Sequence, residues 1–165
     1  MKLPRAKCVL VAALLLTIAT APDCAGAEKI ATYVNGKRVD FASLVGSGPL
    51  PTLLIKGHAM IPARFFDEVL HEDFDLHLLH WGILRIGGLS LKIGDKVACF
   101  PAPMVGGSAG APVPLPLPPL EIDGRIYVPA RAVLNTLGHA VYWDTEERAI
   151  WITENGAPEK KGAFL

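Results

Sequence analysis

Two stretches of the chain repeat one pattern of apolar and polar positions. The run Ile55-Lys-Gly-His-Ala-Met-Ile-Pro-Ala-Arg64 returns 67 residues later as Ile122-Asp-Gly-Arg-Ile-Tyr-Val-Pro-Ala-Arg131. Each copy holds a glycine turn, a short apolar strand and a proline suited to the first position of a helix, where its missing N–H leaves no hydrogen bond unmade. The pattern predicts two copies of one supersecondary unit.

A short helix is expected to begin at Pro62 and another at Pro129. In each copy the following apolar residues share one helical face, namely Phe65, Phe66, Val69 and Leu70 in the first and Ala130, Val133, Leu134 and Leu137 in the second. Gly138 stands where a helix commonly ends. The first copy departs from the pattern, because His71-Glu72-Asp73 follows its helix without a glycine.

Strand hairpins flank both expected helices. Residues 31–41 alternate around Asn35-Gly36, a pair that supplies the positive-φ residues of a tight turn. After the second helix, pairing of Trp143 with Ile150 would place Tyr142 and Trp151 together on the outer face, because strand side chains alternate. The same pairing turns four residues inward: Val141, Trp143, Ile150 and Ile152.

The first copy is expected to continue with a hairpin over 74–86 and further strand over 89–100. Residues 112–119 are rich in proline and should be extended, outside any sheet interior. We therefore predict an α+β fold, in which two repeats of antiparallel strand hairpins each pack on one short helix. Repeat one covers about 30–88 and repeat two about 89–153. Residues 154–165 form a polar, flexible tail.

The N-terminus predicts export. Three basic residues precede an apolar run over 8–19, and small residues at 25 and 27 suit cleavage before Glu28. We interpret 1–27 as a secretory signal peptide, and the run is shorter than the about 20 residues of a membrane span. The domain is then 28–153, secreted or held in the cell envelope, with no stable membrane span after cleavage.

Charge and cysteine content narrow the functional classes. The whole chain has a formal net charge of +0, and nothing resembles the basic footprint that nucleic-acid binding needs. Cys8 and Cys24 lie in the signal peptide, so Cys99 would be the lone cysteine of the exported chain. We expect it to be buried in a strand as a small apolar residue, the alternative being an exposed thiol.

The motifs resemble the copper amine oxidase N-terminal-like (stalk) domain. The residues that carry this resemblance are the Asn-Gly-Lys hairpin, Ile122-x-Gly-Arg-x-Tyr-Val-Pro-x-Arg131, Gly138, and Val141-x-Trp-Asp144. The second copy matches more closely, and together the two tandem copies cover roughly 30–153. The resemblance implies a small accessory module without catalysis. The tyrosines also lack the Asn-Tyr-Asp/Glu setting of the amine oxidase cofactor, so we expect no catalytic residues and no cofactor.

Three groups of residues are candidate sites. His71, His77 and His80 could form a weak metal site, although no zinc-binding spacing is present, and the remaining histidines, His58 and His139, are expected at the surface. Arg64 and Arg131 could clamp an anion, but their recurrence in both copies favours a structural role. Tyr142 and Trp151 could form an aromatic patch for sugars or a partner, or could pack on 112–119 or on the other copy.

The leading hypothesis is an exported, non-catalytic module for binding or spacing at the bacterial cell envelope or outside the cell. The partner would be cell-wall glycan or another surface protein. Two alternatives stay open, a small metal-assisted enzyme that uses the histidine group and an inhibitor or chaperone of another exported protein.

Overall fold

The computed structural model describes residues 27–41, 51–76, 79–101 and 110–154. Residues 1–26 of the expected signal peptide and residues 155–165 of the expected tail lie outside the described residues, and so does His77. Within these described ranges, thirteen strands, two α-helices and one 3₁₀ turn follow in chain order: β1 (Glu28–Val34), β2 (Lys37–Arg38), β3 (Thr52–Ile55), β4 (His58–Pro62), α1 (Arg64–Glu68), β5 (Phe74–Asp75), η1 (Leu79–Trp81), β6 (Ile83–Ile86), β7 (Leu89–Lys92), β8 (Val97–Ala98), β9 (Val113–Pro114), β10 (Leu120–Ile122), β11 (Arg125–Pro129), α2 (Ala130–Thr136), β12 (Ala140–Asp144) and β13 (Ala149–Thr153).

The fold is mostly β, so the predicted α+β class is wrong. Strands account for 47% of the structure and helices for 13%. Strands from both expected repeats join one eight-stranded sheet, in the order β10-β11-β4-β3-β1-β13-β12 with β2 paired to β1. Local periodicity identified the hairpins, but their strands pair across the two repeats. The helices, of five and seven residues, are too short to form a layer of their own.

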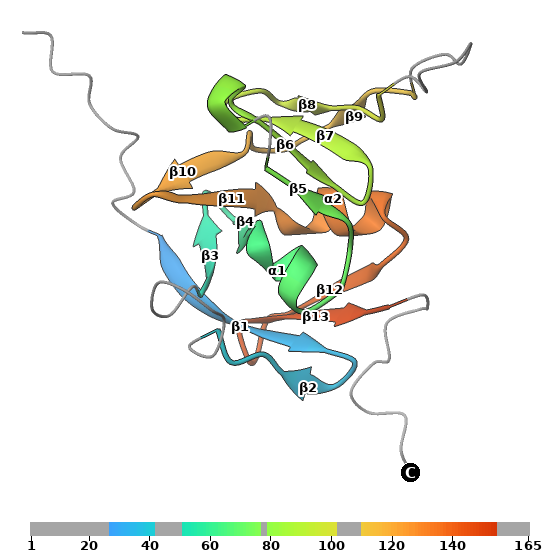
Figure 1. Cartoon of the computed structure of the whole chain (residues 1–165). Helices are drawn as coiled ribbons and strands as arrows, with labels where there is room; N and C mark the ends of the chain where they lie inside the picture. Colours follow the sequence, from blue (N-terminus) through green and yellow to red (C-terminus); the bar gives the residue numbers. More distant parts are fainter. Residues whose placement is uncertain (1–26, 42–50, 77–78, 102–109, 155–165) are drawn as a thin grey trace, which may run out of the picture.

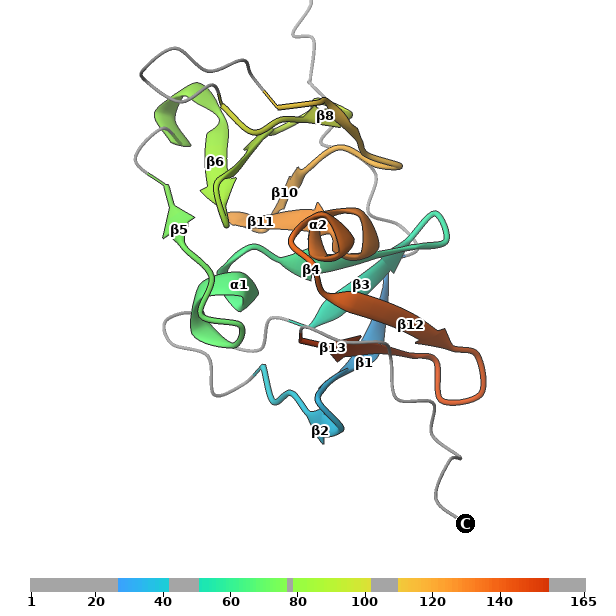
Figure 2. The same ribbon diagram turned by 90° about the vertical axis from the view of Figure 1, so that its right-hand side faces the viewer.

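β1 joins the two halves of this sheet. Its first residues pair antiparallel with β3, whereas Ala31 to Val34 pair in parallel with β13. Strands from the two ends of the described chain therefore lie side by side (Figure 1). The described part of the chain also forms two smaller sheets, β5-β6-β7 and β8-β9. In Figure 2, α2 is seen nearly end-on between β6–β8 and the β12–β13 hairpin.

The two sequence motifs meet at the pairing of β4 with β11. Ile61 lies opposite Val128, which occupies the equivalent position of the second motif, and the ladder extends one residue to either side. The turns before these strands also match, since Lys56-Gly57 and Asp123-Gly124 all have positive φ, at 48°, 77°, 51° and 71°. Such angles suit the type I′ hairpin, whose twist matches that of the strands. Equivalent positions of the two motifs thus face each other in this ladder.

Both prolines end strands, and the helices begin after them. Pro62 is the last residue of β4 and α1 starts at Arg64, while Pro129 ends β11 and precedes α2. Ala63 N–H donates to the Ile126 carbonyl at 2.8 Å, so the Pro62 nitrogen points to the other side of β4. On that side the pairing with β3 stops at Leu53 and Met60, so no ladder donor is needed at Pro62. The predicted helix start at Pro62 was therefore wrong.

The main core fills the space between the large sheet, both helices and β6–β7. Its fully buried members include Ile61, Val128, Phe65, Phe66 and Leu134, each 0% exposed. A second cluster on the other face of the sheet contains Leu53, Met60 and Tyr127. Within the sheet, the buried hydroxyls of Thr32 and Thr52 share a hydrogen bond of 2.6 Å, which satisfies two polar groups that would otherwise destabilise the fold.

The described part of the β12–β13 hairpin confirms the predicted register. Trp143 pairs with Ile150, and Ile150 and Ile152 are each 1% exposed on the inner face. The expectation for Cys99 was wrong, because this thiol is exposed. Cys99 pairs with Ser90 in a single bridge, and alternation along the segment turns the neighbouring Ala98 inward instead, at 0% exposure.

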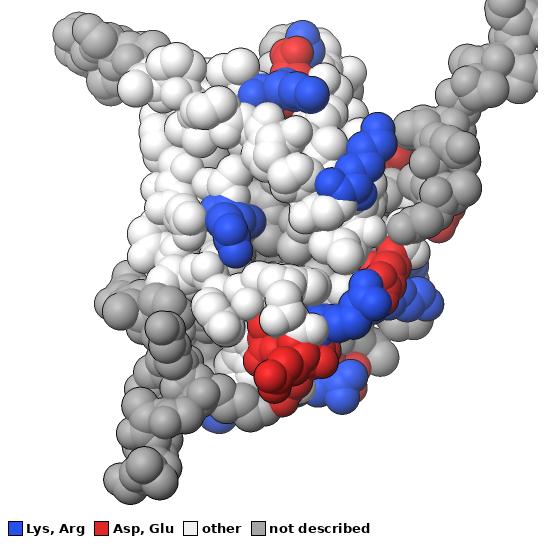
Figure 3. Space-filling model, turned by 180° about the vertical axis from the view of Figure 1, so that it is seen from behind, with Lys and Arg blue, Asp and Glu red and all other residues white. Residues whose placement is uncertain are grey.

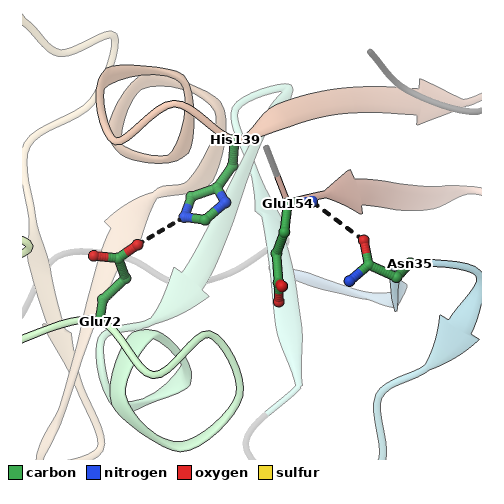
Figure 4. Close-up of polar contacts among 4 residues, drawn as sticks. All are labelled: Asn35, Glu72, His139 and Glu154. Atoms are coloured by element: carbon green, nitrogen blue, oxygen red, sulfur yellow. Dashed lines mark hydrogen bonds and ion pairs between the residues drawn. The ribbon is translucent and has the colours of Figure 1, made fainter. Parts of the chain in front are cut away.

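After each helix, the chain turns at a residue with positive φ. His71 (φ 54°) takes this role after α1 and Gly138 (φ 91°) after α2, so a histidine replaces the missing glycine of the first copy. The next residues, Glu72 and His139, turn toward each other (Figure 4) and the Glu72 Oε1 to His139 Nε2 distance is 3.0 Å. His139 is 6% exposed, which contradicts its expected surface position.

Replacing Glu72 should destabilise the protein. Glu72→Ala leaves His139 Nε2 without its acceptor in a site where Nδ1 already has no hydrogen-bond partner among the described residues. We expect a loss of about 1–3 kcal/mol in the free energy of unfolding, measured by urea denaturation. Glu72→Gln, which keeps an acceptor, should lose less. The control is Glu68→Ala, whose carboxylate lies 3.9 Å from the Arg64 guanidinium, a surface pair expected to contribute less than about 1 kcal/mol.

Tyr127 should make the protein sensitive to alkali. Burial raises the pKa of its phenol above 10.0; the Arg125 charge opposes this rise and Asp123 adds to it. Because the folded pKa exceeds the unfolded one, its stabilising contribution is complete below about pH 10 and is lost as the pH rises through the folded pKa. Tyr127→Phe should therefore flatten the fall of Tm above pH 10. An unchanged slope would contradict this assignment, and Tyr142→Phe is the matched control.

Candidate functional site

An aromatic row crosses the outer face of the sheet. Tyr142 on β12 lies opposite Trp151 on β13, and Trp151 lies opposite Tyr33 on β1. Tyr33 in turn pairs with Arg38 on β2. Residues directly opposite each other on neighbouring strands share a face, so the three rings stand in one line that ends at a cation. We call Tyr142, Trp151 and Tyr33 the aromatic row.

The rings of the row differ in their contacts. Tyr33 and Trp151 are stacked, with ring centroids 4.2 Å apart and an angle of 5° between their planes. Tyr142 is 41% exposed. Trp151 thus packs on a residue of the first expected repeat, one of the alternatives left open by the sequence. Sequence analysis identified Tyr142 and Trp151 but missed Tyr33, because β1 lies at the opposite end of the described chain.

The strands hold this row by the alternation of their side chains. On the inner face of the same strands, Ile150 and Ile152 anchor the hairpin in the core. The β1–β2 turn is tied to β13, since Asn35 N–H donates to the Ile152 carbonyl at 2.9 Å and Asn35 Oδ1 accepts from Glu154 N–H at 3.2 Å (Figure 4). At the other end of β13, Arg148 forms an ion pair with Glu28. The strands that carry the aromatic row are therefore held by hydrogen bonds at one end of β13 and by an ion pair at the other.

The two equivalent arginines have different neighbours. Arg64 Nη1 lies 3.9 Å from Glu68 Oε1, one helical turn away. The position equivalent to Glu68 in the second motif is Asn135, so Arg131 has no carboxylate one turn along its helix. Both arginines are exposed.

Two of the three histidines of the predicted metal group, His71 and His80, lie in the described residues. His71 is exposed at the end of α1, and His80 lies in η1 with its ring 4.6 Å from that of Trp81. His77 lies outside the described residues. Across the described ranges, no group of three His, Cys, Asp or Glu residues could hold a metal ion. Sequence reasoning missed His139, whose partner Glu72 lies 67 residues away.

The surface carries mixed charge. In Figure 3 the face seen from behind is largely uncharged, with basic side chains scattered across it. The largest group of acidic side chains lies near its lower edge, and others lie at the top and on the right. Tyr127 is the described group whose pKa is clearly raised, and it lies in the second cluster, away from the aromatic row. In the described ranges, no helix has the length and apolar character required to cross a bilayer.

Residues 108–158 match the family model of the copper amine oxidase N-terminal domain. The match spans β9 to β13 with α2, and so contains the second motif, Tyr142 and Trp151. The first motif lies outside it, and the match covers fewer than half of the 165 residues. This domain of the amine oxidases is a non-catalytic module, which agrees with a non-catalytic role here. No curated protein and no solved structure matches the chain.

The stacked pair of the row should contribute to stability. A double-mutant cycle with Tyr33→Ala and Trp151→Ala should give a coupling energy of about 0.5–1.5 kcal/mol in urea denaturation, as for other aromatic pairs. The cycle with Tyr142→Ala and Trp151→Ala provides the comparison and should give a smaller coupling, because the stack joins Trp151 to Tyr33. Equal coupling in the two cycles would contradict this description of the row.

Proposed function

We propose that the chain is an exported, non-catalytic module that binds cell-wall glycan through the aromatic row. The observation that carries this proposal is the alignment of Tyr142, Trp151 and Tyr33 on adjacent strands of one sheet face. Aromatic side chains offer large, rigid contact area at little conformational cost. Tyr33 and Trp151 cover one face of each other by stacking, whereas the exposed Tyr142 ring lies outside this stack and can offer its face to the C–H surface of a sugar ring. The hydroxyl of Tyr142 and the guanidinium of Arg38 can meet sugar hydroxyls.

The dimensions of the row suit an extended chain of sugars. Neighbouring strands lie about 4.8 Å apart, so the outer rings of a row over three strands are roughly 10 Å apart. This span is comparable to a disaccharide unit. A linear glycan running across the strands would contact successive rings, and the end of the row at Arg38 would favour a glycan that carries carboxylates.

Export and repeat organisation are part of the same proposal. The basic and apolar N-terminal segment supports a secreted or envelope location, and the match to a non-catalytic domain supports a binding or spacing role. We also propose that the chain contains two tandem copies of one unit. The antiparallel pairing of Ile61 with Val128 and the matching turns at Gly57 and Gly124 support this view. The metal-assisted enzyme has no observation in its favour among the described residues.

Binding to purified peptidoglycan sacculi tests this function. The fraction of protein that sediments with sacculi should fall about two- to tenfold in Trp151→Ala and in Tyr142→Ala, as expected when an aromatic contact of about 0.5–1.5 kcal/mol is lost. Trp81→Ala is the control, because Trp81 is 66% exposed but lies in η1, outside the row. Binding that is unchanged in both row variants would exclude the row as the contact surface. Binding lost equally in the control would point to non-specific adhesion.

A further inference from the structure

A groove opens where the main core reaches the surface. It has a volume of about 650 Å³ and lies between the β3–β4 hairpin, α2 and the inner face of β12 and β13. Ala59, Ala132, Val141 and Trp143 line it, and each is a partly buried residue packed against the core. Ile150, 1% exposed, also lines the groove. Its volume falls within the roughly 300–1,000 Å³ typical of small-molecule sites.

One cationic side chain at this apolar groove forms no ion pair with another described residue. Arg131 lines the groove and is exposed. No ion pair or hydrogen bond joins its guanidinium to another described residue. No acidic residue contributes to the lining either; His58 is the other ionisable group there. The contrast with Arg64, which lies near Glu68, shows that the second copy keeps the charge but lacks its neutralising neighbour.

A groove of this composition suits a ligand with two distinct parts. Apolar walls favour a hydrocarbon body, because its burial removes apolar surface from water. A guanidinium beside such walls favours a planar anion, since its fork matches a carboxylate with two parallel hydrogen bonds. A neutral apolar ligand would form no ion pair with Arg131. A strongly hydrophilic anion would bury little of the apolar surface that lines the groove.

We propose that the groove binds a small monocarboxylate with an apolar body, held by Arg131 at its carboxylate and by Val141 and Trp143 along its chain. This site is independent of the proposed glycan contact, because Trp143 faces inward on β12 while its neighbour Tyr142 faces outward. A molecule in the groove would touch three elements at once, the β3–β4 hairpin, α2 and the β12–β13 hairpin, and would thereby close the open side of the core.

Octanoate and its neutral counterpart octanol test the proposal. Titration of the ¹⁵N-labelled full chain, followed at the Trp143 indole N–H by NMR, should show saturable binding of octanoate with a Kd of about 1 mM or tighter. Octanol should bind about tenfold more weakly, because it cannot form the charge-assisted pair. Equal affinities for the two probes, or shifts that never saturate, would overturn the proposal.

Matched variants distinguish the contribution of the Arg131 charge to binding from that of the apolar groove lining. Arg131→Gln should lower the affinity for octanoate to that for octanol, whereas Arg64→Gln, the equivalent arginine outside the groove lining, should leave it unchanged. Ala132→Leu keeps Arg131 but narrows the groove, and should weaken both probes. The proposal fails if Arg131→Gln behaves like Arg64→Gln. These results do not depend on binding to sacculi, so the proposal for the groove and the proposal for the aromatic row can be rejected independently of each other.

Discussion

The pairing of β4 with β11 is the contact on which the rest of the structure depends. It lies within the order β10-β11-β4-β3-β1-β13-β12 and joins strands of two related motifs into one sheet. Ile61 and Val128 face each other at its midpoint, and both belong to the main core. Because each strand leads directly into a helix, this ladder also fixes where α1 and α2 begin relative to each other. Most of the core packs around that arrangement.

One equivalent pair of residues in the two motifs differs and is in direct contact. Glu72 and His139 occupy the same position of the two motifs and lie 3.0 Å apart. Two identical acids at such a position would repel each other in a partly buried site, where charges interact strongly. A carboxylate and an imidazole are complementary instead. At the periphery the motifs can diverge without this constraint, as Glu68 and Asn135 do.

Short-range features of the fold could be predicted from the sequence, and pairings between distant segments could not. The register of Trp143 with Ile150 followed from alternating apolar positions around a short turn. The same rule could have placed Cys99 outward, beside the buried Ala98. By contrast, no local pattern predicts that Tyr33 lies beside Trp151, or that His139 contacts the carboxylate of Glu72. The candidate site was therefore found in part, through the two residues on one hairpin.

The same limit explains the wrong fold class. Periodicity identifies a strand and its buried face, but it does not say which strands share a sheet. Proline gave a further misleading signal, because Pro62 suits both the first position of a helix and the end of a strand whose neighbour has stopped. The hydrogen bond from Ala63 N–H to the Ile126 carbonyl, which extends the ladder past Pro62, can be inferred only once the position of β11 is known.

The parallel pairing of β1 with β13 has a consequence for the order of folding. Ala31 and Ala149 are adjacent in the sheet but lie well over a hundred residues apart in the chain. Contacts of such sequence separation form slowly, because a long loop must close before they are made. During synthesis the first strand of the sheet emerges long before its neighbour. The large sheet therefore cannot be completed until β13 is available to pair with β1.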